Sequence, residues 1–370
     1  MASKVYFVDL RANPRLNLLD KTALLLEKLG IREVIRPSRQ VGIKIHFGER
    51  GNLAFIRPQY VRRVVDLLKE LGASPFLTDT NTLYKGSRSD AVVHLETAIE
   101  NGFDFAVVRA PIIIADGLLG DNFVRLEVDF PLLKELFIAQ AIYRADALVV
   151  MSHVKGHELS GFGGAIKNLG MGCAARKGKL AQHSTIAPKV NKKKCVFCKT
   201  CLEYCPSGAI APGPTGKRMV IEPQKCIGCG ECIAICPSGA IQVQWNEVGP
   251  VFLKKLAEYA KGALWGKADR ALFLNFIMNV SPACDCYHFN DYPFVRDIGI
   301  LASRDPVAID QASVDLINQE MALPGSALTR NVSPGEDKLR GLYPKVDWEI
   351  QLDHAEEIGL GSRQYQLERL

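Results

Sequence analysis

The sequence predicts an α/β protein in which a mostly parallel sheet carries helices on both faces and a small cysteine-rich α+β domain is inserted. Short apolar runs alternate with amphipathic helical segments through the first 190 residues, which is typical of a parallel sheet. The alternation stops at residues 191–245, where Cys, Gly, Pro and Lys accumulate, and then resumes. We therefore expect residues 1–190 and 246–370 to form two parts of one α/β domain around this insertion. The alternative is two separate α/β halves joined by the cysteine-rich segment.

Five strands and one clear helix are expected before the insertion. The helix spans residues 58–71, because Pro58 suits a first helical turn and Gly72 suits the exit. Apolar residues between them recur at spacings of three and four, which gives the helix one apolar face. The strands are expected at short apolar runs, which are Val5–Leu10, Val41–Phe47, Pro75–Thr80, Phe105–Arg109 and Ala147–Met151.

The α/β pattern resumes after the insertion. A helix is expected over Val251–Ala263, and buried strands are expected over Ala271–Val280 and Arg296–Ala302. Asp305 then has the character of a helix N-cap, and Pro306 that of the first helical residue.

The cysteine-rich segment repeats itself with a period of 31 residues, which indicates a duplicated half-domain. Each copy has the pattern C-x2-C-x2-C-x3-C-P, the spacing of bacterial two-cluster ferredoxins. The copies read Cys195-Val-Phe-Cys-Lys-Thr-Cys201 with Cys205-Pro-Ser-Gly-Ala-Ile, and Cys226-Ile-Gly-Cys-Gly-Glu-Cys232 with Cys236-Pro-Ser-Gly-Ala-Ile.

This spacing predicts two 4Fe-4S clusters, each held by three cysteines of one copy and the fourth cysteine of the other. The insertion is therefore expected to be a two-cluster ferredoxin-like α+β domain. A zinc ribbon is disfavoured, because zinc normally needs two cysteine pairs separated by a loop. The expected ligand sets are Cys195, Cys198, Cys201 and Cys236 for one cluster, and Cys226, Cys229, Cys232 and Cys205 for the other.

Three cysteines remain outside the repeat. Cys173 ends a Gly-rich stretch after the strand ending at Met151, while Cys284 and Cys286 follow the strand ending at Val280. Because ligands bind beyond the carboxyl ends of strands in open α/β sheets, we expect these two loops to meet.

His153 and His157 lie in the first of these loops and strengthen the case for a site. We predict a third metal site with Cys173, Cys284 and Cys286 as ligands, either a metal ion or a cluster with one iron open to substrate. A histidine, for which His153 and His157 are the candidates, or a small molecule fills the fourth position. One alternative is that the cysteines are packing residues only. Another is a redox-active pair of Cys284 and Cys286, although one intervening residue strains a disulfide.

Two further features mark the same region. Lys44 and His46 alternate along one strand, so both are expected to face one cleft, while Asp79 and Asn81 end the next strand. The glycines of residues 161–164 either cradle a phosphate or carboxylate at a helix start or allow close backbone packing.

Three segments resemble a known family. Lys44-Ile-His-Phe-Gly48, Gly163-Gly-Ala-Ile-Lys-Asn-Leu-Gly-Met-Gly172 and Cys284-Asp-Cys286 occur in the expected order, with the ferredoxin repeat among them. The chain is similar, over nearly its whole length, to the family called domain of unknown function 362. Such proteins are usually described as iron–sulfur cluster-binding proteins. The resemblance implies clusters and supplies no substrate or catalytic residue.

Charge and apolar runs limit the expected partners and location. The formal net charge of +6 is modest, and its densest basic run, residues 189–194, precedes the first cysteine. This run is either a solvated linker face or a docking site for an acidic redox partner such as a ferredoxin or flavoprotein. Nucleic acid is not expected, because no aromatic residues interleave with the lysines. No signal peptide or membrane span is evident, so we expect a cytoplasmic protein.

The sequence thus favours an iron–sulfur oxidoreductase that passes single electrons to or from a small-molecule substrate in the α/β body. A flavin stays open as a further cofactor, because many flavin sites lack a short signature. The first alternative is a non-enzymatic electron carrier or cluster-delivery adaptor that docks a larger enzyme. The second is a ligand-binding redox sensor.

Overall fold

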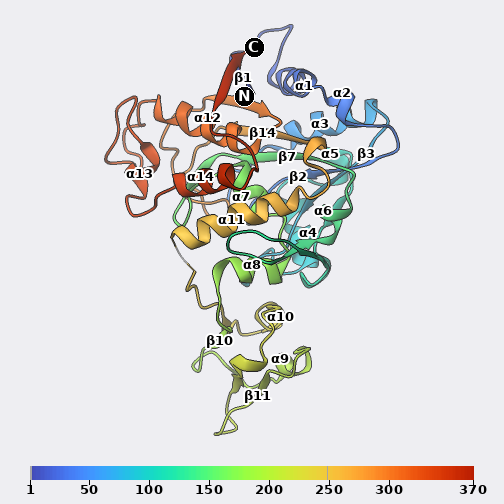
Figure 1. Ribbon diagram of the computed structural model, residues 1–370, viewed down its shortest axis with the longest axis vertical. Helices are drawn as coiled ribbons and strands as arrows, with labels where there is room; N and C mark the ends of the chain where they lie inside the picture. Colours follow the sequence, from blue (N-terminus) through green and yellow to red (C-terminus); the bar gives the residue numbers. More distant parts are fainter. Residues whose placement is uncertain (1, 248) are drawn as a thin grey trace.

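The computed structural model describes residues 2–247 and 249–370, and an eight-stranded sheet runs through this part of the chain. Its strands are β1 (Ser3–Asp9), β2 (Gln40–Lys44), β3 (Ser74–Asp79), β4 (Ile112–Ile114), β7 (Ala147–His153), β14 (Ala271–Ile277), β15 (Gly299–Ser303) and β16 (Tyr365–Arg369). They lie in the order β16-β1-β15-β14-β7-β2-β3-β4 (Figure 1). Five of the seven neighbouring pairs are parallel, and β15 is antiparallel to both of its neighbours. The predicted mostly parallel sheet is confirmed.

Helices cover both faces of the sheet, as predicted. Successive side chains of a strand point to opposite faces, so Leu148 and Val150 join one hydrophobic cluster while Val149 and Met151 join the other. The helices packed on the first face are α6 (Gln140–Arg144), α7 (Ala165–Gly170), α11 (Pro250–Ala263), α12 (Pro306–Asn318) and α14 (Glu349–Glu357), with α13 (Lys338–Leu342) at its margin. The helices on the second face are α1 (Leu18–Lys28), α2 (Ile31–Val34), α3 (Pro58–Glu70), α4 (Ala91–Glu100) and α5 (Phe105–Val108).

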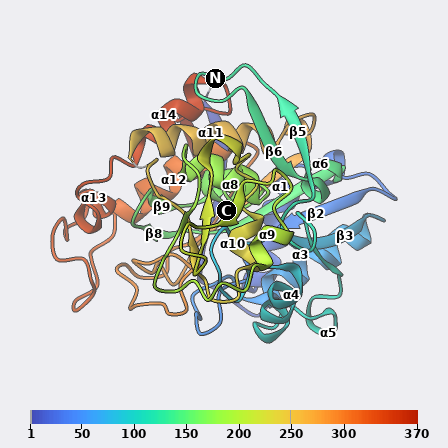
Figure 2. The same ribbon diagram turned by 90° about the horizontal axis from the view of Figure 1, so that it is seen from below.

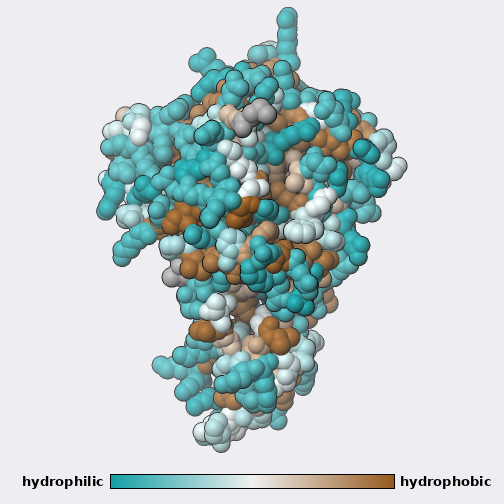
Figure 3. All heavy atoms as spheres, viewed as in Figure 1, coloured by the Kyte–Doolittle hydropathy of each residue, from teal (hydrophilic) through white to brown (hydrophobic). Residues whose placement is uncertain are grey.

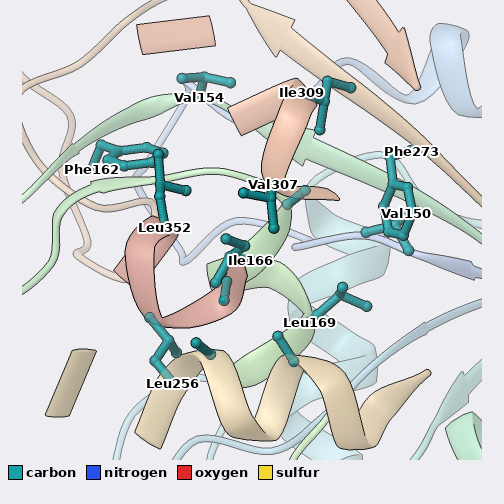
Figure 4. Packing of buried hydrophobic residues seen from close by; sticks show 14 of the residues in the cluster. Val150, Val154, Phe162, Ile166, Leu169, Leu256, Phe273, Val307, Ile309 and Leu352 are labelled. Carbon is teal, nitrogen blue, oxygen red and sulfur yellow. The ribbon is translucent and has the colours of Figure 1, made fainter. Parts of the chain in front are cut away.

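Helix α7 is fixed in the first of these clusters (Figure 4). Ile166 and Leu169 of α7 pack with Val150 of the sheet and Leu256 of α11, and all four side chains are fully buried. Burial of each such side chain contributes about 1.5–3 kcal/mol. Two short hairpins adjoin this face, β5 (Phe123–Glu127) with β6 (Glu135–Ala139) and β8 (Lys155–His157) with β9 (Gly161–Gly163).

Most of the expected elements are present. The helix predicted at residues 58–71 is α3, and the helix predicted at residues 251–263 is α11. Asp305 caps α12, since its carboxylate accepts hydrogen bonds from the backbone N–H groups of Val307 at 2.8 Å and Ala308 at 3.0 Å. Six of the seven predicted strands correspond, within a few residues at each end, to β1, β2, β3, β7, β14 and β15.

The strand predicted at Phe105–Arg109 is wrong. This run forms the single helical turn α5, because the Asp104 carboxylate accepts hydrogen bonds from the N–H groups of Ala106 and Val107. The turn ends at Arg109, whose φ of 59° is left-handed. A short apolar run has no periodicity by which a strand can be told from a buried helical turn. Here the N-cap Asp104 stabilises the helical turn. The edge strand is β4, three residues further on.

The cysteine-rich segment forms a small lobe with its own hydrophobic cluster (Figure 1). Its elements are β10 (Lys189–Val190), α9 (Thr200–Glu203), β11 (Ile210–Pro212), β12 (Met219–Ile221), α10 (Glu231–Ile235) and β13 (Ile241–Gln242). Strand β10 pairs with β13, so the chain enters and leaves the lobe side by side. Figure 2 views the molecule from the lobe, with α10 in front of α8 (Arg176–His183), and Leu180 of α8 packs in the lobe's cluster.

The molecule narrows where the lobe joins the body, and hydrophobic residues gather at the surface of this neck (Figure 3). Leu83 of the body joins the lobe's hydrophobic cluster beside Ile233 and Ile241. None of the helices in the described residues combines the length and apolar character needed to cross a membrane.

Gly170 allows α7 to lie against α11, because a Cβ at this position would be 2.2 Å from the carbonyl oxygen of Leu256. We expect Gly170→Ala to lower the free energy of unfolding by about 1–3 kcal/mol, measured by urea denaturation. Gly86→Ala is the matched control, since its Cβ would have ordinary contacts only. Equal stability of the two variants would contradict this packing.

Candidate functional site

A cavity of about 170 Å³ lies at the edge of the sheet where β14, β7, β2 and β3 end. These neighbouring strands are parallel, so their carboxyl ends meet at this edge. Each strand or its following loop supplies a lining residue: Lys44 ends β2, Asp79 ends β3, His153 ends β7, and Cys284 follows β14. The two loops that the sequence expected to meet do so here.

A buried ion pair lies at one side of the cavity. Lys44 Nζ is 2.9 Å from Asp79 Oδ1 and 2.6 Å from Asn168 Oδ1. Burial alone would raise the pKa of Asp79, but nearby positive charge, that of Lys44 above all, holds the pKa below its usual range. Gly172 leaves room for the pair, because a Cβ there would lie 2.6 Å from Lys44 Nζ. His46 lines the same cavity, as its alternation with Lys44 predicted.

A second buried carboxylate, Asp285, holds His153 and Lys155. His153 Nδ1 is 2.9 Å from Asp285 Oδ1, and its Nε2 is 2.8 Å from the carbonyl oxygen of Met278. Lys155 Nζ is 3.2 Å from Asp285 Oδ2. Burial alone would raise the pKa of Asp285, but the charges of His153 and Lys155 lower it. Both ring nitrogens of His153 face acceptors, so His153 is anchored as a hydrogen-bond donor and offers no free nitrogen to a ligand.

The two cysteines of the loop after β14 form a thiol pair at the cavity wall. Lys167 Nζ lies 3.8 Å from Cys284 Sγ, and the backbone N–H of Cys286 donates to the same sulfur at 3.4 Å. A hydrogen bond between the two cysteine side chains lowers the pKa of Cys284, with Lys167 and His157 acting in the same direction. The same side-chain hydrogen bond raises the pKa of Cys286. Cys284 is therefore the more acidic thiol of the pair.

Cys173 lies apart from this pair. Its side chain is fully buried in the hydrophobic cluster of α7, and its Sγ faces the carbonyl oxygen of Asn168 at 3.8 Å. Burial raises the pKa of Cys173 to about 12. The structure thus brings His153, His157, Cys284 and Cys286 to one cavity and leaves Cys173 outside its lining. Within residues 2–247 and 249–370, no three His, Cys, Asp or Glu side chains are arranged to hold a single metal ion.

The Gly-rich stretch is occupied by a carboxylate of the chain itself. Asp310 of α12 accepts hydrogen bonds from the N–H groups of Ala165 at 2.7 Å and Ile166 at 2.9 Å, at the start of α7. Asn275 Nδ2 donates to the same carboxylate at 2.8 Å. A Cβ on Gly164 would lie 2.3 Å from Asp310 Oδ1. Of the two alternatives from sequence, the glycines therefore serve close packing around an internal carboxylate.

The loop after β3 joins the cavity to the lobe. Lys85 Nζ donates to the carbonyl oxygens of Cys236 at 3.0 Å and Pro237 at 3.3 Å. The adjacent Tyr84 hydroxyl donates to the carbonyl oxygen of Cys286 at 3.3 Å. Two consecutive residues thus contact a cysteine loop of the lobe and the thiol pair of the body.

Cysteines from the two copies of the repeat lie close to one another in the lobe. Burial raises the pKa of Cys201 to about 11, and the neighbouring thiols that add to this shift are Cys236, Cys198 and Cys195. These four cysteines also line one common cavity. Burial likewise raises the pKa of Cys232, and the thiols around it are Cys229, Cys226, Cys201 and Cys205.

The two copies of the cysteine repeat share their backbone geometry. Phe197 and Lys199 have φ values of 55° and 65°, and the residues 31 positions later, Gly228 and Gly230, have 68° and 76°. The N–H of Ala209 donates to Cys205 Sγ at 3.2 Å, and the corresponding bond from Ala240 to Cys236 Sγ is also 3.2 Å. Four converging thiols with N–H groups directed at sulfur form a donor set that fits a 4Fe-4S cluster.

Several residues at or beside the cavity are not among the site residues that the sequence predicts. Asp285 was passed over although it stands between the two flagged cysteines, and Tyr84 gave no signal beyond its place after a strand. Arg88 lies on the same loop and pairs with Glu49 at 3.1 Å, where both side chains are buried. Asn81, in contrast, bonds Asp116 rather than lining the cavity.

The fold and site define an α/β protein with a cavity, lined by charged and aromatic side chains, at the carboxyl edge of its parallel strands and a cysteine-rich lobe beside it. Residues 41–315 match the family described as Domain of unknown function (DUF362), and the chain belongs to this family. No curated protein shows significant similarity to the chain.

Two solved structures show distant similarity. The lactate racemase apoprotein from Thermoanaerobacterium thermosaccharolyticum is 15% identical, with 87% of this chain and 59% of that chain covered and a TM-score of 0.43. A structural-genomics target from Thermotoga maritima is 9% identical, with 94% and 60% covered and a TM-score of 0.39. The chain thus spans about three fifths of the length of each.

Lys44→Met would leave the Asp79 carboxylate buried without its partner. We expect it to lower the free energy of unfolding by about 3–5 kcal/mol in urea denaturation, because an uncompensated buried charge is costly. Adding Asp79→Asn should recover a large part of this loss. Lys217→Met, at an exposed position of the lobe, should change stability by less than about 0.5 kcal/mol. A loss no larger than that of the control would argue against the pair.

His183 links stability to pH. Burial lowers its pKa to about 3, whereas the unfolded chain has a pKa of about 6.5. The folded state takes up this proton only near pH 3, so stability that is present above pH 6.5 is lost as the pH falls. Between pH 7.5 and 5.5 the loss from this group is about 1.3 kcal/mol.

We expect His183→Phe, which keeps an aromatic ring at this position, to lose about 1.3 kcal/mol less stability than the wild type between pH 7.5 and pH 5.5. Urea denaturation at the two pH values measures this difference. His288→Phe is the matched control, because His288 is exposed and the full acid sensitivity should remain. An unchanged pH dependence of His183→Phe would contradict the assignment.

Proposed function

We propose that this chain is an iron–sulfur redox protein. Two 4Fe-4S clusters would be held in a ferredoxin-like insertion at residues 191–245, inside one α/β domain built from residues 1–190 and 246–370. When bound, such clusters supply one-electron transfer. The α/β cavity is the place where those electrons would reach or leave a small-molecule substrate.

One observation supports the proposal: Cys195, Cys198 and Cys201 of the first copy and Cys236 of the second line one common cavity of the lobe. Around Cys232 lie Cys226 and Cys229 of the same copy together with Cys205 and Cys201 of the first. Packing alone does not explain a group of cysteines drawn from both copies, because four hydrophobic side chains would fill the same space. The shared left-handed residues and N–H···S bonds of the two copies support the same assignment.

The cavity side of the proposal depends on the chain's own contacts. Tyr84 and Lys85 bridge the loop of Cys236 and the carbonyl of Cys286, so lobe and cavity are joined by two adjacent residues. At the cavity wall, Lys167 places a positive charge beside the Cys284 sulfur. These residues would bind and orient a substrate close to the lobe. The third metal site at Cys173, Cys284 and Cys286 stays a prediction.

A second candidate function is electron carriage or cluster delivery to a larger enzyme. The lobe supports it with exposed large apolar side chains, namely Val196, Ile227 and Tyr204, whose exposed fractions are 67%, 52% and 46%. Lys192–Lys194 are exposed beside them. An acidic partner such as a ferredoxin or flavoprotein would dock on such a surface.

The cluster assignment is tested by iron and acid-labile sulfide contents of anaerobically purified protein. We expect about eight irons per chain, and about four after Cys198→Ser or after Cys229→Ser, which remove one ligand from different sets. Dithionite-reduced protein should give the EPR signal of reduced 4Fe-4S clusters. Bound zinc without sulfide would overturn the proposal.

The matched control is the triple variant Cys173→Ser, Cys284→Ser and Cys286→Ser. Unchanged iron in this variant limits the metal to the lobe, whereas loss of iron above eight per chain assigns the third site. If this variant still transfers electrons to an external acceptor at the wild-type rate, the carrier function is favoured over an enzyme of the cavity.

A further inference from the structure

The cations that line the cavity are paired within the protein, with one exception. Lys44 pairs with Asp79, Lys155 with Asp285 and Arg88 with Glu49. Lys179 donates to the carbonyl oxygen of Thr80 at 3.3 Å. Among the described residues, Lys167 is the lining cation without an oxygen acceptor, and its contact is the Cys284 sulfur at 3.8 Å.

The Lys167 side chain reaches the cavity through space left by a glycine. Gly163 lets its stem pass, because a Cβ there would lie 3.2 Å from Lys167 Cδ and 3.5 Å from Lys155 Cε. The carboxylate that acts on it, Glu158, already accepts a hydrogen bond from the Tyr287 hydroxyl at 2.9 Å. A half-buried ammonium with one weak sulfur acceptor has hydrogen-bonding capacity left for an anionic ligand.

An aromatic wall adjoins this cation. The His183 ring stacks on Phe252 with centroids 4.7 Å apart and meets Trp245 edge-on at 4.6 Å, and all three residues line the cavity. Lys167 and the three rings of this wall line the same cavity. Aromatic walls of this kind bind flat apolar groups by stacking or edge contact.

The cavity volume sets how much of a ligand can be enclosed. A cavity of about 150 Å³ holds one benzene molecule. The cavity here, of about 170 Å³, therefore accommodates one six-membered ring with one small substituent.

We propose that the cavity binds a small acid made of one planar ring and one anionic group, with the anion on Lys167 and the ring against His183, Trp245 and Phe252. This names the substrate class of the site and rests on the proposed function. The thiol pair of Cys284 and Cys286 then lies beside the anionic group, on the side from which Tyr84 and Lys85 lead to the lobe.

The test is isothermal titration of the anaerobically purified protein with benzoate, benzamide and acetate under anaerobic conditions. Benzoate should bind at least tenfold more tightly than benzamide, which has the same shape without the charge. It should also bind at least tenfold more tightly than acetate, which lacks the ring. This comparison needs no variant. Equal affinity for benzoate and benzamide, or no benzoate binding at millimolar concentration, would overturn the proposal.

Lys167→Met should weaken benzoate binding at least tenfold, to the affinity of benzamide, while Lys217→Met should leave it unchanged. An unaltered affinity in folded Lys167→Met protein would also overturn the proposal. Iron content measured on the same samples separates the two ideas. If the protein binds benzoate but contains no clusters, the redox function is refuted and the ligand class is kept. If the protein contains about eight irons but does not bind benzoate, the ligand class is refuted and the redox function is kept.

Discussion

The carboxylate of Asp310 holds the position on which the cavity depends. Asp310 lies on α12 and accepts hydrogen bonds from the first two backbone N–H groups of α7 and from the side chain of Asn275 on β14. Three elements therefore meet at one buried carboxylate. Burial raises the pKa of Asp310, and the three hydrogen bonds lower it by favouring the charged form. The net result is a pKa of about 6. Because α7 carries Lys167 and Asn168, a shift of this helix would move the partners of both Cys284 and Lys44.

Buried charges give the cavity its rigidity at a cost in desolvation. Asp79, Asp285 and Glu49 each hold a cationic side chain that would otherwise be free to turn toward solvent or a ligand. Taking an ion out of water costs several kcal/mol, so such groups persist only with close partners and additional hydrogen bonds. Lys167 departs from this arrangement, and its remaining hydrogen-bonding capacity is what distinguishes a ligand-binding position from a structural one.

The lobe carries a different kind of constraint. Phe197 and Lys199 adopt left-handed backbone angles that their second-copy counterparts, Gly228 and Gly230, adopt without strain. The first copy therefore keeps the loop geometry although its sequence does not favour it. Convergence of the sulfur atoms, rather than local preference, explains why the two loops have the same shape.

The sequence alone determined the features that follow from short-range patterns. The mostly parallel sheet and the capped helix at Asp305 both follow from periodicity and caps within a few residues. The meeting of the loops that carry His153 and Cys284 followed from the rule that parallel strands end at one edge. The strand expected at Phe105–Arg109 was wrong, because an apolar run of that length has no period and the cap at Asp104 decided its form.

The tertiary structure alone decided which side chains face the cavity. Cys173 follows a cavity strand in sequence yet turns into the core, whereas Tyr84 reaches Cys286 across 202 positions. Asp285 and Asp310 act on groups more than 130 positions away. Such partners are chosen by packing between helices and strands far apart in the chain, and no local pattern records that choice.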